Sequence, residues 1–283
     1  MPSLHALTGT AAGRLKAAGV PPDEADLDAQ LLAARVLHWD RTRLLTSWRE
    51  DAPPGFAEAF LALVARREQR EPISQILGTR EFWGLELEVT RDVFTPRPET
   101  DGVIEAALEH ARAAREIVDV GTGSGALAIA LAREFPDARV VAVDVSEAAL
   151  AVAARNATRH GVADRIELKP AHLLDSVAGP VDLIVSNPPY VPEGDWPRLP
   201  PEVRDYEPPE ALFAGPDGLD AIRDLVAAAP ARLAEDGLLI FECGIDQDAA
   251  IREMIAPTAG LELIEIRRDL AGIPRVAVAR RRG

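Results

Sequence analysis

The spacing of apolar residues changes once along the chain, from a helical period to short, strand-like runs. Up to residue 75, large apolar residues recur every three or four positions, first over 27–37 and then over 56–64. Double prolines at 21–22 and 53–54 precede these two runs, as is typical of helix starts. The pattern predicts a helical domain over residues 1–75, and we expect it to dock a substrate or cover a site.

A short alternating stretch follows this helical domain. Leu85, Leu87 and Val89 alternate with charged residues after Gly84, which is the pattern of a β-hairpin. We expect a hairpin linker over 76–98, which runs into the proline-rich stretch "TPRPETD".

From residue 99 to 283, strand patterns alternate with helical ones. Helices of crossover length separate most of the strands, which predicts an α/β domain with a seven-stranded, mostly parallel, doubly wound sheet. A short Gly/Pro turn joins the last two strands, so we expect these two to be antiparallel. The strand candidates are 116–120, 139–144, 165–168, 181–186, 237–242, 261–267 and 275–279.

Composition and charge narrow the class of protein. The chain has 283 residues, 47% of them hydrophobic, which suits one large domain or two unequal domains. The single cysteine, Cys243, has no partner for an internal disulfide, and neither a secretory leader nor a membrane-length apolar run is visible. We therefore expect a cytoplasmic protein that does not bind a membrane; its oligomeric state stays open, with a monomer as the default.

Negative charge is concentrated in the second part of the chain. The formal net charge is −15, and residues 1–75 hold nine Lys or Arg against ten Asp or Glu, so the remainder carries −14. An acidic surface repels a phosphate backbone and favours a neutral or basic partner. We expect no direct contact with nucleic acid.

A glycine-rich turn follows the first strand of the predicted sheet, in "EIVDVGTGSGALAIALA". Gly121, Gly123 and Gly125 permit close approach of a ligand and leave the next helix N-terminus open. Asp119 ends this strand, and Asp144 ends the next, where a carboxylate suits a ribose diol. The pattern Asp119-x-Gly121-x-Gly123-x-Gly125 resembles the S-adenosylmethionine turn of class I methyltransferases, a dinucleotide fits the looser G-x-G-x-x-A match, and a turn without a ligand is the third alternative.

The fourth strand ends in Asn187-Pro188-Pro189-Tyr190, at the same edge of the sheet as the glycine turn. The two prolines remove backbone donors and fix two φ angles, so the Asn187 amide and the Pro188 carbonyl face outward as acceptors. Two such acceptors can hold both protons of a planar –NH2 group, while Tyr190 offers a flat face for stacking. The alternative is a proline turn in which Asn187 bonds its own backbone.

A nitrogen held in this way can attack the sulfonium methyl of S-adenosylmethionine. That displacement depends on positioning and electrostatics, and it needs no metal and no Cys or His nucleophile. The five histidines show no metal-ligand spacing. The combined pattern predicts methyl transfer to an amide or amine nitrogen.

Motifs over nearly the whole chain resemble the bacterial release-factor glutamine methyltransferases (HemK/PrmC family). NPPY alone is shared with adenine and cytosine amino-methyltransferases, but the ordered set is specific. Besides the helical N-terminal domain, the motifs are "PISQILGTREFWGLELEVT", "FTPRPETD", "DVGTGSG", "VVAVDVS", "IVSNPPY", "YEPPEALFAGPDGL" and "FECGIDQ". The resemblance implies N5-methylation of the glutamine in the Gly-Gly-Gln motif of class-1 peptide chain release factors, with S-adenosylmethionine as cofactor.

The resemblance also implies roles for single residues. The cofactor-binding residues are Asp119, Gly121, Thr122, Gly123, Ser124, Gly125, Asp144, His172, Leu173 and Asn187. His172 stands where the family often has an acid, so Asp175 is an alternative adenine contact. The substrate-side residues are Arg97, Glu99, Asn187, Pro188, Pro189 and Tyr190. For Arg97 and Glu99 a structural salt bridge is the alternative, and Glu207 with Pro208 is expected to order the loop over the site.

Three rival hypotheses make different demands on the sequence. A DNA or RNA amino-methyltransferase predicts a basic groove, which the acidic second part does not provide. A NAD-dependent oxidoreductase leaves the NPPY corner without a task. A non-catalytic domain that binds S-adenosylmethionine keeps the cofactor turn but does not need Asn187.

Overall fold

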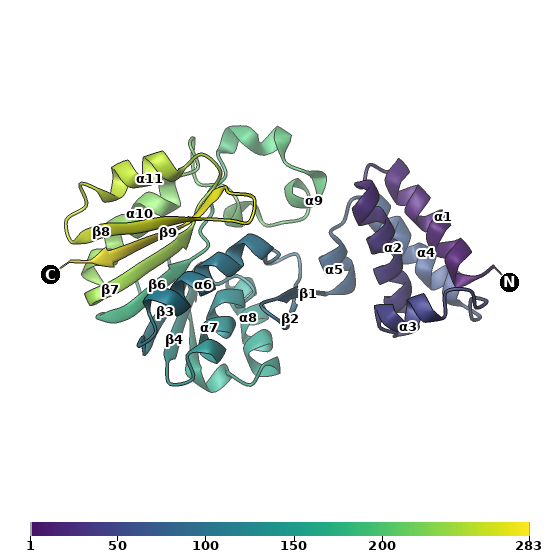
Figure 1. The fold of residues 1–283 in the computed structure, drawn as a ribbon, viewed down its shortest axis with the longest axis horizontal. Coiled ribbons are helices and arrows are strands. Elements are labelled where there is room, and N and C mark those ends of the chain that lie inside the picture. The colour runs from purple at the N-terminus through teal and green to yellow at the C-terminus, as the bar shows by residue number, and fades with distance from the viewer. Residues whose placement is uncertain (1, 283) are drawn as a thin grey trace. The chain divides into compact units, whose positions relative to one another are not determined.

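The computed structural model describes residues 2–282, which fold as two compact units (Figure 1). The helical unit comprises residues 2–78 together with the distant segment Pro200–Tyr206, and the sheet unit comprises Thr79–Leu199 and residues 207–282. The chain therefore passes from one unit to the other three times. None of the described helices is long and apolar enough to cross a membrane.

Local signals at the helix ends explain the helical unit. Ser3 and Asp40 are N-cap residues, whose side-chain oxygens accept from backbone N–H groups of the helices that follow them. Pro22 is the first residue of another helix, a position that proline favours. The helices are α1 (Leu4–Ala17), α2 (Pro22–Leu37), α3 (Arg41–Thr46), α4 (Phe56–Glu68), α5 (Ile73–Leu77) and α9 (Pro201–Arg204). Leu15, Leu32 and Phe60 are fully buried in their shared core. The two helices predicted from apolar spacing are confirmed as α2 and α4.

The sheet unit contains a seven-stranded sheet in the order β5-β4-β3-β6-β7-β9-β8. Its strands are β3 (Glu116–Val120), β4 (Arg139–Asp144), β5 (Ile166–Pro170), β6 (Val181–Ser186), β7 (Leu233–Glu242), β8 (Leu261–Arg268) and β9 (Pro274–Arg281). Only β9 runs antiparallel to its neighbours β7 and β8. The predicted mostly parallel sheet with a terminal antiparallel pair is confirmed.

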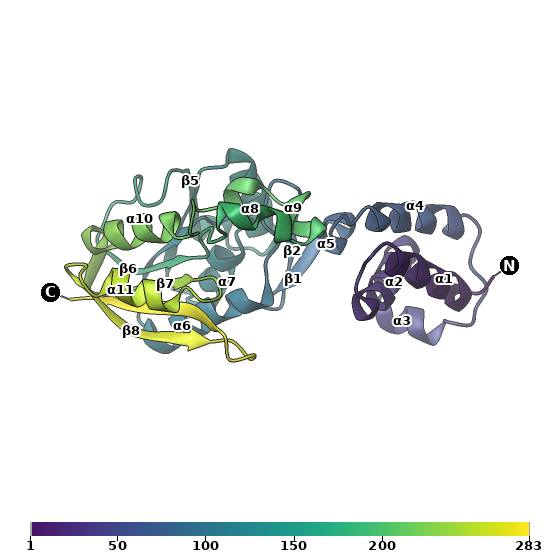
Figure 2. The same ribbon diagram turned by 90° about the horizontal axis from the view of Figure 1, so that it is seen from above.

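Helices cover both faces of this sheet. On one face lie α6 (Asp101–His110), α7 (Ala126–Glu134) and α8 (Glu147–Arg159); on the other lie α10 (Asp220–Ala228) and α11 (Asp248–Ile255) (Figures 1 and 2). Successive strand residues alternate between the two apolar layers, so that Val185 belongs to the first and Ile184 to the second. Burial on both faces is the reason why these strands read as continuous apolar runs.

The predicted hairpin is present as β1 (Thr79–Phe82) and β2 (Leu85–Glu88), paired antiparallel. It belongs to the sheet unit, because Phe82, Leu85 and Leu87 are buried in the apolar layer beneath α6 and α7. The unit boundary therefore lies at 78/79, whereas the sequence placed a separate linker over 76–98. Short 3-10 helices occur at Pro98–Thr100, Ala163–Arg165, Glu193–Arg198, Pro209–Ala211 and Ala229–Ala231.

Candidate active site

Three motifs meet where the parallel strands of the sheet end. The glycine turn follows β3, Asp144 ends β4, and the NPPY corner follows β6, which pairs with β3 on the side away from β4. Parallel strands place their carboxyl ends at one edge, and ligands bind outside that edge. The order of the strands thus brings together the candidates that the sequence predicted separately.

The glycine turn is held against β4 by its backbone. The Gly121 and Thr122 N–H groups donate to the Val143 carbonyl, at 2.9 and 3.0 Å. Gly121, Gly123 and Gly125 have φ angles of +72°, +54° and +84°, which favour glycine. A Cβ on Gly125 would lie 3.0 Å from the Ile129 side chain, whereas a Cβ on Gly123 would meet nothing within 4 Å. Gly125 therefore serves packing of the helix, and Gly123 faces open space.

Asp119 lies beneath this turn. Its side chain is fully buried, and its Oδ2 accepts from Thr122 Oγ1 at 2.6 Å and from Ala128 N–H at 3.1 Å. Burial raises the pKa of Asp119 to about 7. The sequence suggested a cofactor contact for Asp119, and the structure places its carboxylate in the bonds that order the turn and the start of α7.

Asp144 lies beside the turn at the end of β4. Its Oδ2 accepts from Gly123 N–H at 2.8 Å and its Oδ1 from Ser146 N–H at 2.9 Å, so the carboxylate is held in one orientation. The loop that follows β5 is tied to the same place, because Ala171 N–H donates to the Asp144 carbonyl at 3.0 Å. His172 in this loop is exposed and Leu173 is half-buried. These residues surround one side of the turn.

The NPPY corner lies across from the glycine turn. A Cβ on Gly121 would lie 4.0 Å from the Asn187 carbonyl oxygen. Asn187 Nδ2 donates to Thr100 Oγ1 at 3.1 Å, and Tyr190 O–H donates to Glu242 Oε1 at 3.0 Å. Within residues 2–282, Asn187 Oδ1 and the Pro188 carbonyl have no hydrogen-bond donor. Two acceptors are thus available for a ligand next to the turn.

Arg97 and Glu99 have different surroundings although they are two residues apart. Arg97 Nη2 donates to Glu207 Oε1 at 2.7 Å, and its guanidinium lies over the Phe94 ring. Burial raises the pKa of Glu207, and Arg97 acts in the opposite direction. Glu99 is exposed. The salt bridge anticipated for this stretch joins Arg97 to Glu207, which anchors the end of the loop that leaves the NPPY corner.

Sequence reasoning did not single out Thr100, and it quoted Glu242 within "FECGIDQ" without a role. The Thr100 hydroxyl donates to Glu242 Oε2 at 2.6 Å, and both side chains are buried behind Asn187 and Tyr190. The position of Glu242 at the end of a strand could have identified it as a site residue. Glu242 ends β7, which pairs with β6 and therefore ends at the same edge as the NPPY corner.

Comparison with known proteins agrees with this geometry. Residues 7–78 match the family model described as PrmC N-terminal domain, and residues 99–196 match Methyltransferase small domain. A release factor glutamine methyltransferase of Cereibacter sphaeroides is 45% identical over 94% of this chain and 94% of its own. The chain belongs to the release factor glutamine methyltransferase family. The resemblance seen in the sequence motifs is thereby confirmed.

Solved structures of other methyltransferases share the fold of this family member. Ribosomal protein L11 methylase of Lactobacillus delbrueckii subsp. bulgaricus is 25% identical, with a TM-score of 0.50 over 66% of this chain and 81% of its own. The T. thermophilus 16S rRNA N2 G1207 methyltransferase, solved with AdoMet and guanosine, is 19% identical, with a TM-score of 0.51 over 72% of this chain and 50% of its own. The α/β class I methyltransferase fold is confirmed.

The residues of this family member fit S-adenosylmethionine. A Cβ on Gly123 would project into open space, so a ligand can approach the backbone of the turn there. The Asp144 carboxylate is held beside that space with lone pairs left over after its two backbone bonds. A turn that exposes backbone and an oriented carboxylate is the combination that an amino-acid group and a ribose require.

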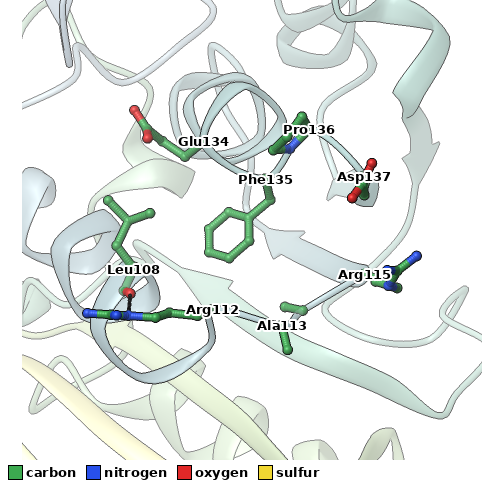
Figure 3. Close-up of a pocket in the computed structure, with 9 residues that line it drawn as sticks. Leu108, Arg112, Ala113, Arg115, Glu134, Phe135, Pro136 and Asp137 are labelled. Carbon is green, nitrogen blue, oxygen red and sulfur yellow. Dashed lines mark hydrogen bonds between the residues drawn. The ribbon is translucent and has the colours of Figure 1, made fainter.

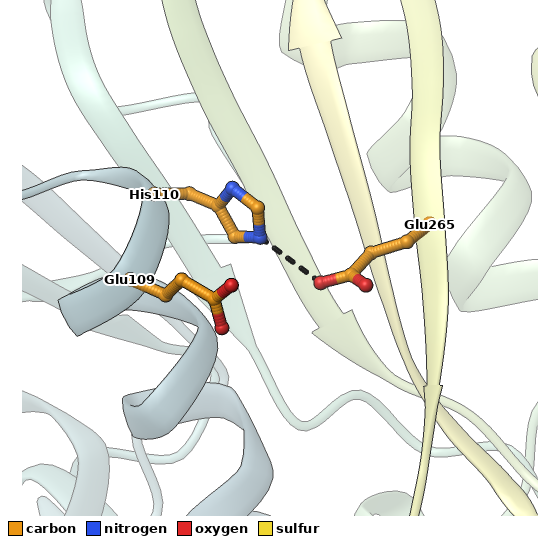
Figure 4. A group of neighbouring side chains, drawn as sticks. All are labelled: Glu109, His110 and Glu265. Carbon is orange, nitrogen blue, oxygen red and sulfur yellow. Dashed lines mark hydrogen bonds and ion pairs between the residues drawn. The ribbon is translucent and has the colours of Figure 1, made fainter.

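A group of titratable side chains outside this site consists of Glu109 and His110 on α6 and Glu265 on β8 (Figure 4). His110 Nε2 lies 2.9 Å from Glu265 Oε1. Arg267 Nη1 lies 2.6 Å from Glu109 Oε2 and 3.4 Å from Glu265 Oε1, so a guanidinium already neutralises these carboxylates. We interpret the group as a surface ion-pair cluster.

A pocket opens at the opposite edge of the sheet from the glycine turn. It lies between the segment that leads into β3 and the end of α7, and Phe135 projects into it (Figure 3). Arg115, which lines it, directly precedes the first residue of β3. Since the motifs all follow the carboxyl ends of the strands, this pocket is separate from the candidate active site.

Proposed function

We propose that the protein transfers a methyl group from S-adenosylmethionine to the side-chain amide nitrogen (N5) of the glutamine in the Gly-Gly-Gln motif of class-1 peptide chain release factors. Family membership supports a methyltransferase of this kind, since the relative in Cereibacter sphaeroides is a release factor glutamine methyltransferase. The observation that carries the proposal is the pair of unused acceptors at Asn187 Oδ1 and the Pro188 carbonyl.

The cofactor side of the site is assigned to the turn and its neighbours. Residues 121–125 would hold the methionine part and Asp144 the ribose, with His172 and Leu173 near the adenine. S-adenosylmethionine, when bound, supplies the methyl group as a sulfonium electrophile. Asp119 supports the turn from below through Thr122 and Ala128.

The substrate side is assigned to the NPPY corner. A glutamine –NH2 group has two protons and a delocalised, weakly nucleophilic lone pair. Asn187 Oδ1 and the Pro188 carbonyl each accept one of these protons, which orients the nitrogen and favours its pyramidal form. A glutamate side chain has no such protons, so the same two acceptors disfavour it. Tyr190 would bound the substrate side of the site, where its hydroxyl donates to Glu242.

The charge of the chain supports a protein substrate over a nucleic acid. Residues 76–283 carry −14 of the net −15. A surface of that sign slows association with a phosphate backbone and speeds association with a basic protein. A DNA or RNA amino-methyltransferase with the same NPPY corner is the alternative that the experiment below must exclude.

The test is mass spectrometry of a class-1 release factor after incubation with the enzyme and S-adenosylmethionine. We expect one added methyl on the motif glutamine, none on a release factor with that glutamine changed to alanine, and none on DNA. N187A should bind S-adenosylmethionine normally but methylate about 10²–10³-fold more slowly, since one aimed hydrogen-bonding group is lost. Methylation of DNA in place of release factor, or near wild-type rates for N187A, would contradict the proposal.

A further inference from the structure

Glu242 lies behind the NPPY corner and does not reach the open side of the site. Its side chain is buried, with 1% of the residue exposed. Oε2 accepts from Thr100 Oγ1 at 2.6 Å, and Oε1 accepts from Tyr190 O–H at 3.0 Å. Both carboxylate oxygens thus act as acceptors, each for one hydroxyl group.

The direction of these bonds determines how the Asn187 amide points. A threonine hydroxyl has a single proton, and Thr100 donates it to Glu242. Towards Asn187 the Thr100 oxygen can therefore only accept, and the group it accepts from is Nδ2, at 3.1 Å. With Nδ2 directed to Thr100, Oδ1 is directed to the opposite side as a free acceptor. A reversed amide would place two acceptors against each other.

Tyr190 is held by the loop between β7 and α11, which directly follows Glu242. Gln247 Nε2 donates to the Tyr190 carbonyl at 3.0 Å, and Gln247 Oε1 accepts from Gly244 N–H at 2.8 Å. A Cβ on Gly244 would lie 3.2 Å from Tyr190 Cδ2, so the absence of a side chain admits the ring. The stretch from Glu242 to Gln247 thus contacts Tyr190 at its hydroxyl, its ring and its backbone.

We propose that Thr100 and Glu242 are positioning residues, which fix the Asn187 side chain so that its oxygen faces the substrate nitrogen. That the group accepted there is a glutamine –NH2 rests on the function proposed above. Gly244 and Gln247 hold Tyr190, and we call these two residues together with Thr100 and Glu242 the frame. Neither Thr100 nor Glu242 touches the substrate; they act through Asn187 and Tyr190.

The frame has a direct consequence for selectivity. An Asn187 amide that is free to turn presents –NH2 to the substrate for part of the time, and two donors then face each other. That arrangement no longer favours an amide over a carboxylate. The frame therefore contributes to the choice of glutamine over glutamate as well as to the rate.

The test compares T100V with T100S. Valine has the shape of threonine without its hydroxyl, whereas serine keeps the hydroxyl. We expect T100V to lower kcat about 10- to 100-fold with the Kd for S-adenosylmethionine within about twofold of wild type, and T100S to recover kcat to within about threefold. T258V is the matched control, because Thr258 is partly buried just after α11 and its hydroxyl donates to the Met254 carbonyl of that helix, far from Asn187 in the sequence.

Three outcomes of this comparison would overturn the frame. The first is a T100V kcat within about fivefold of wild type. The second is a loss of cofactor affinity that equals the loss of activity, and the third is a failure of T100S to recover activity; either of these two would indicate a general structural defect. A T258V variant with wild-type activity shows that the change from threonine to valine is tolerated as such.

A second readout does not depend on the substrate. Asn156 and Asn187 are the only asparagines of the chain, so protein labelled with 15N at asparagine shows two side-chain amides, and N187A identifies the second. We expect the Asn187 side-chain protons to exchange with water at least fivefold faster in T100V than in wild type and T100S. Equal rates would overturn the frame. If wild type fails to methylate release factor while this difference persists, the proposed function is wrong and the frame stands.

Discussion

The helical unit and the sheet unit bury charge in different ways. In the helical unit, Arg67 is 2% exposed and lies between two carboxylates, with Nε 2.7 Å from Asp28 Oδ2 and Nη1 2.8 Å from Glu202 Oε1. In the sheet unit, Asp119 and Glu242 are buried against hydroxyl and N–H groups, and neither forms an ion pair with a described residue.

The ion pairs around Arg67 and the hydrogen bonds around Asp119 and Glu242 have different roles. A buried ion pair holds two segments together, and removal of one partner leaves an uncompensated charge. Glu202 belongs to the segment Pro200–Tyr206 and pairs with Arg67 at the end of α4 and with Arg70 just after it. A buried carboxylate without a cation instead orders the donors around it. Burial raises the pKa of Glu242, because it disfavours the charged form of the carboxyl. This unfavourable burial occurs where Asn187 and Tyr190 are oriented.

The largest effect should follow from removing the cation of the helical unit. R67A leaves the buried Asp28 carboxylate without its cation and leaves Glu202 with Arg70 alone, and we expect the unit to lose about 3–5 kcal/mol of stability. R66A is the matched control at less than about 1 kcal/mol, because Arg66 pairs with Glu71 at an exposed position. Urea denaturation of the full chain and amide exchange in α2 and α4 measure the loss. Equal effects of the two substitutions would show that the buried pair is not special.

The next effect concerns pH and the sheet unit. The pKa of Asp119 is about 7 in the folded state against 3.8 for the ordinary carboxyl, so between these values the folded protein keeps a proton that the unfolded chain releases. The free energy of unfolding therefore falls as the pH rises towards 7. Above pH 7 the folded protein bears the full free-energy cost of burying the ionised carboxylate. Between pH 5.5 and 7 we expect a loss of about 2 kcal/mol from this group.

D119N should remove that pH dependence, because its side chain does not titrate. Denaturation curves at several pH values between 5.5 and 8, for wild type and D119N, measure the difference in slope. D164N, which removes an exposed charge from the same unit, serves as the control. Parallel pH profiles for wild type and D119N would mean that Asp119 is ionised in the folded protein throughout this range.

The smallest effect should come from the segment that joins the helical unit late in the chain. E202Q removes the charge that Arg67 and Arg70 share, and we expect about 1–2 kcal/mol of local destabilisation. The amides of Val203, Arg204 and Asp205, which bond within this segment, should then exchange about 5- to 30-fold faster. E210Q changes an exposed acid nearby and should leave them as they are. Unchanged exchange in E202Q would assign the docking of the segment to Tyr206 instead.

The strands were predictable because each is buried on both faces and forms a continuous apolar run between turns. The bounds of β3, β4 and β6 agree with prediction to the residue. Strand β5 begins one residue later than predicted and ends two residues later, and β7, β8 and β9 extend beyond their predicted ranges. Helix α1 gave no separate signal, because Thr8, Ala11 and Ala12 supply much of its buried face. Helix α9 is four residues long and has no periodicity to detect.

The candidate site was predictable as far as its motifs are local. The glycine turn and the NPPY corner are each encoded in a few consecutive residues with unusual backbone demands. Thr100 was passed over between Arg97 and Glu99, since a buried hydroxyl between charged neighbours has no signature of its own. Its role depends on a bond to Glu242, which lies 142 residues further along the chain.

Local sequence patterns were sufficient to predict the order of the elements, the position of the glycine turn, the rigid corner with its two acceptors, and the family. These features depend on backbone preferences and on periodic burial within single elements. Only the tertiary structure decided that Arg67 is buried while the adjacent Arg66 is not, and that Glu202 joins it from 135 residues away. The same holds for the bonds that direct the Asn187 amide. The physical reason is that a polar side chain can be buried only where distant partners satisfy it, and those partners meet only after the chain has folded.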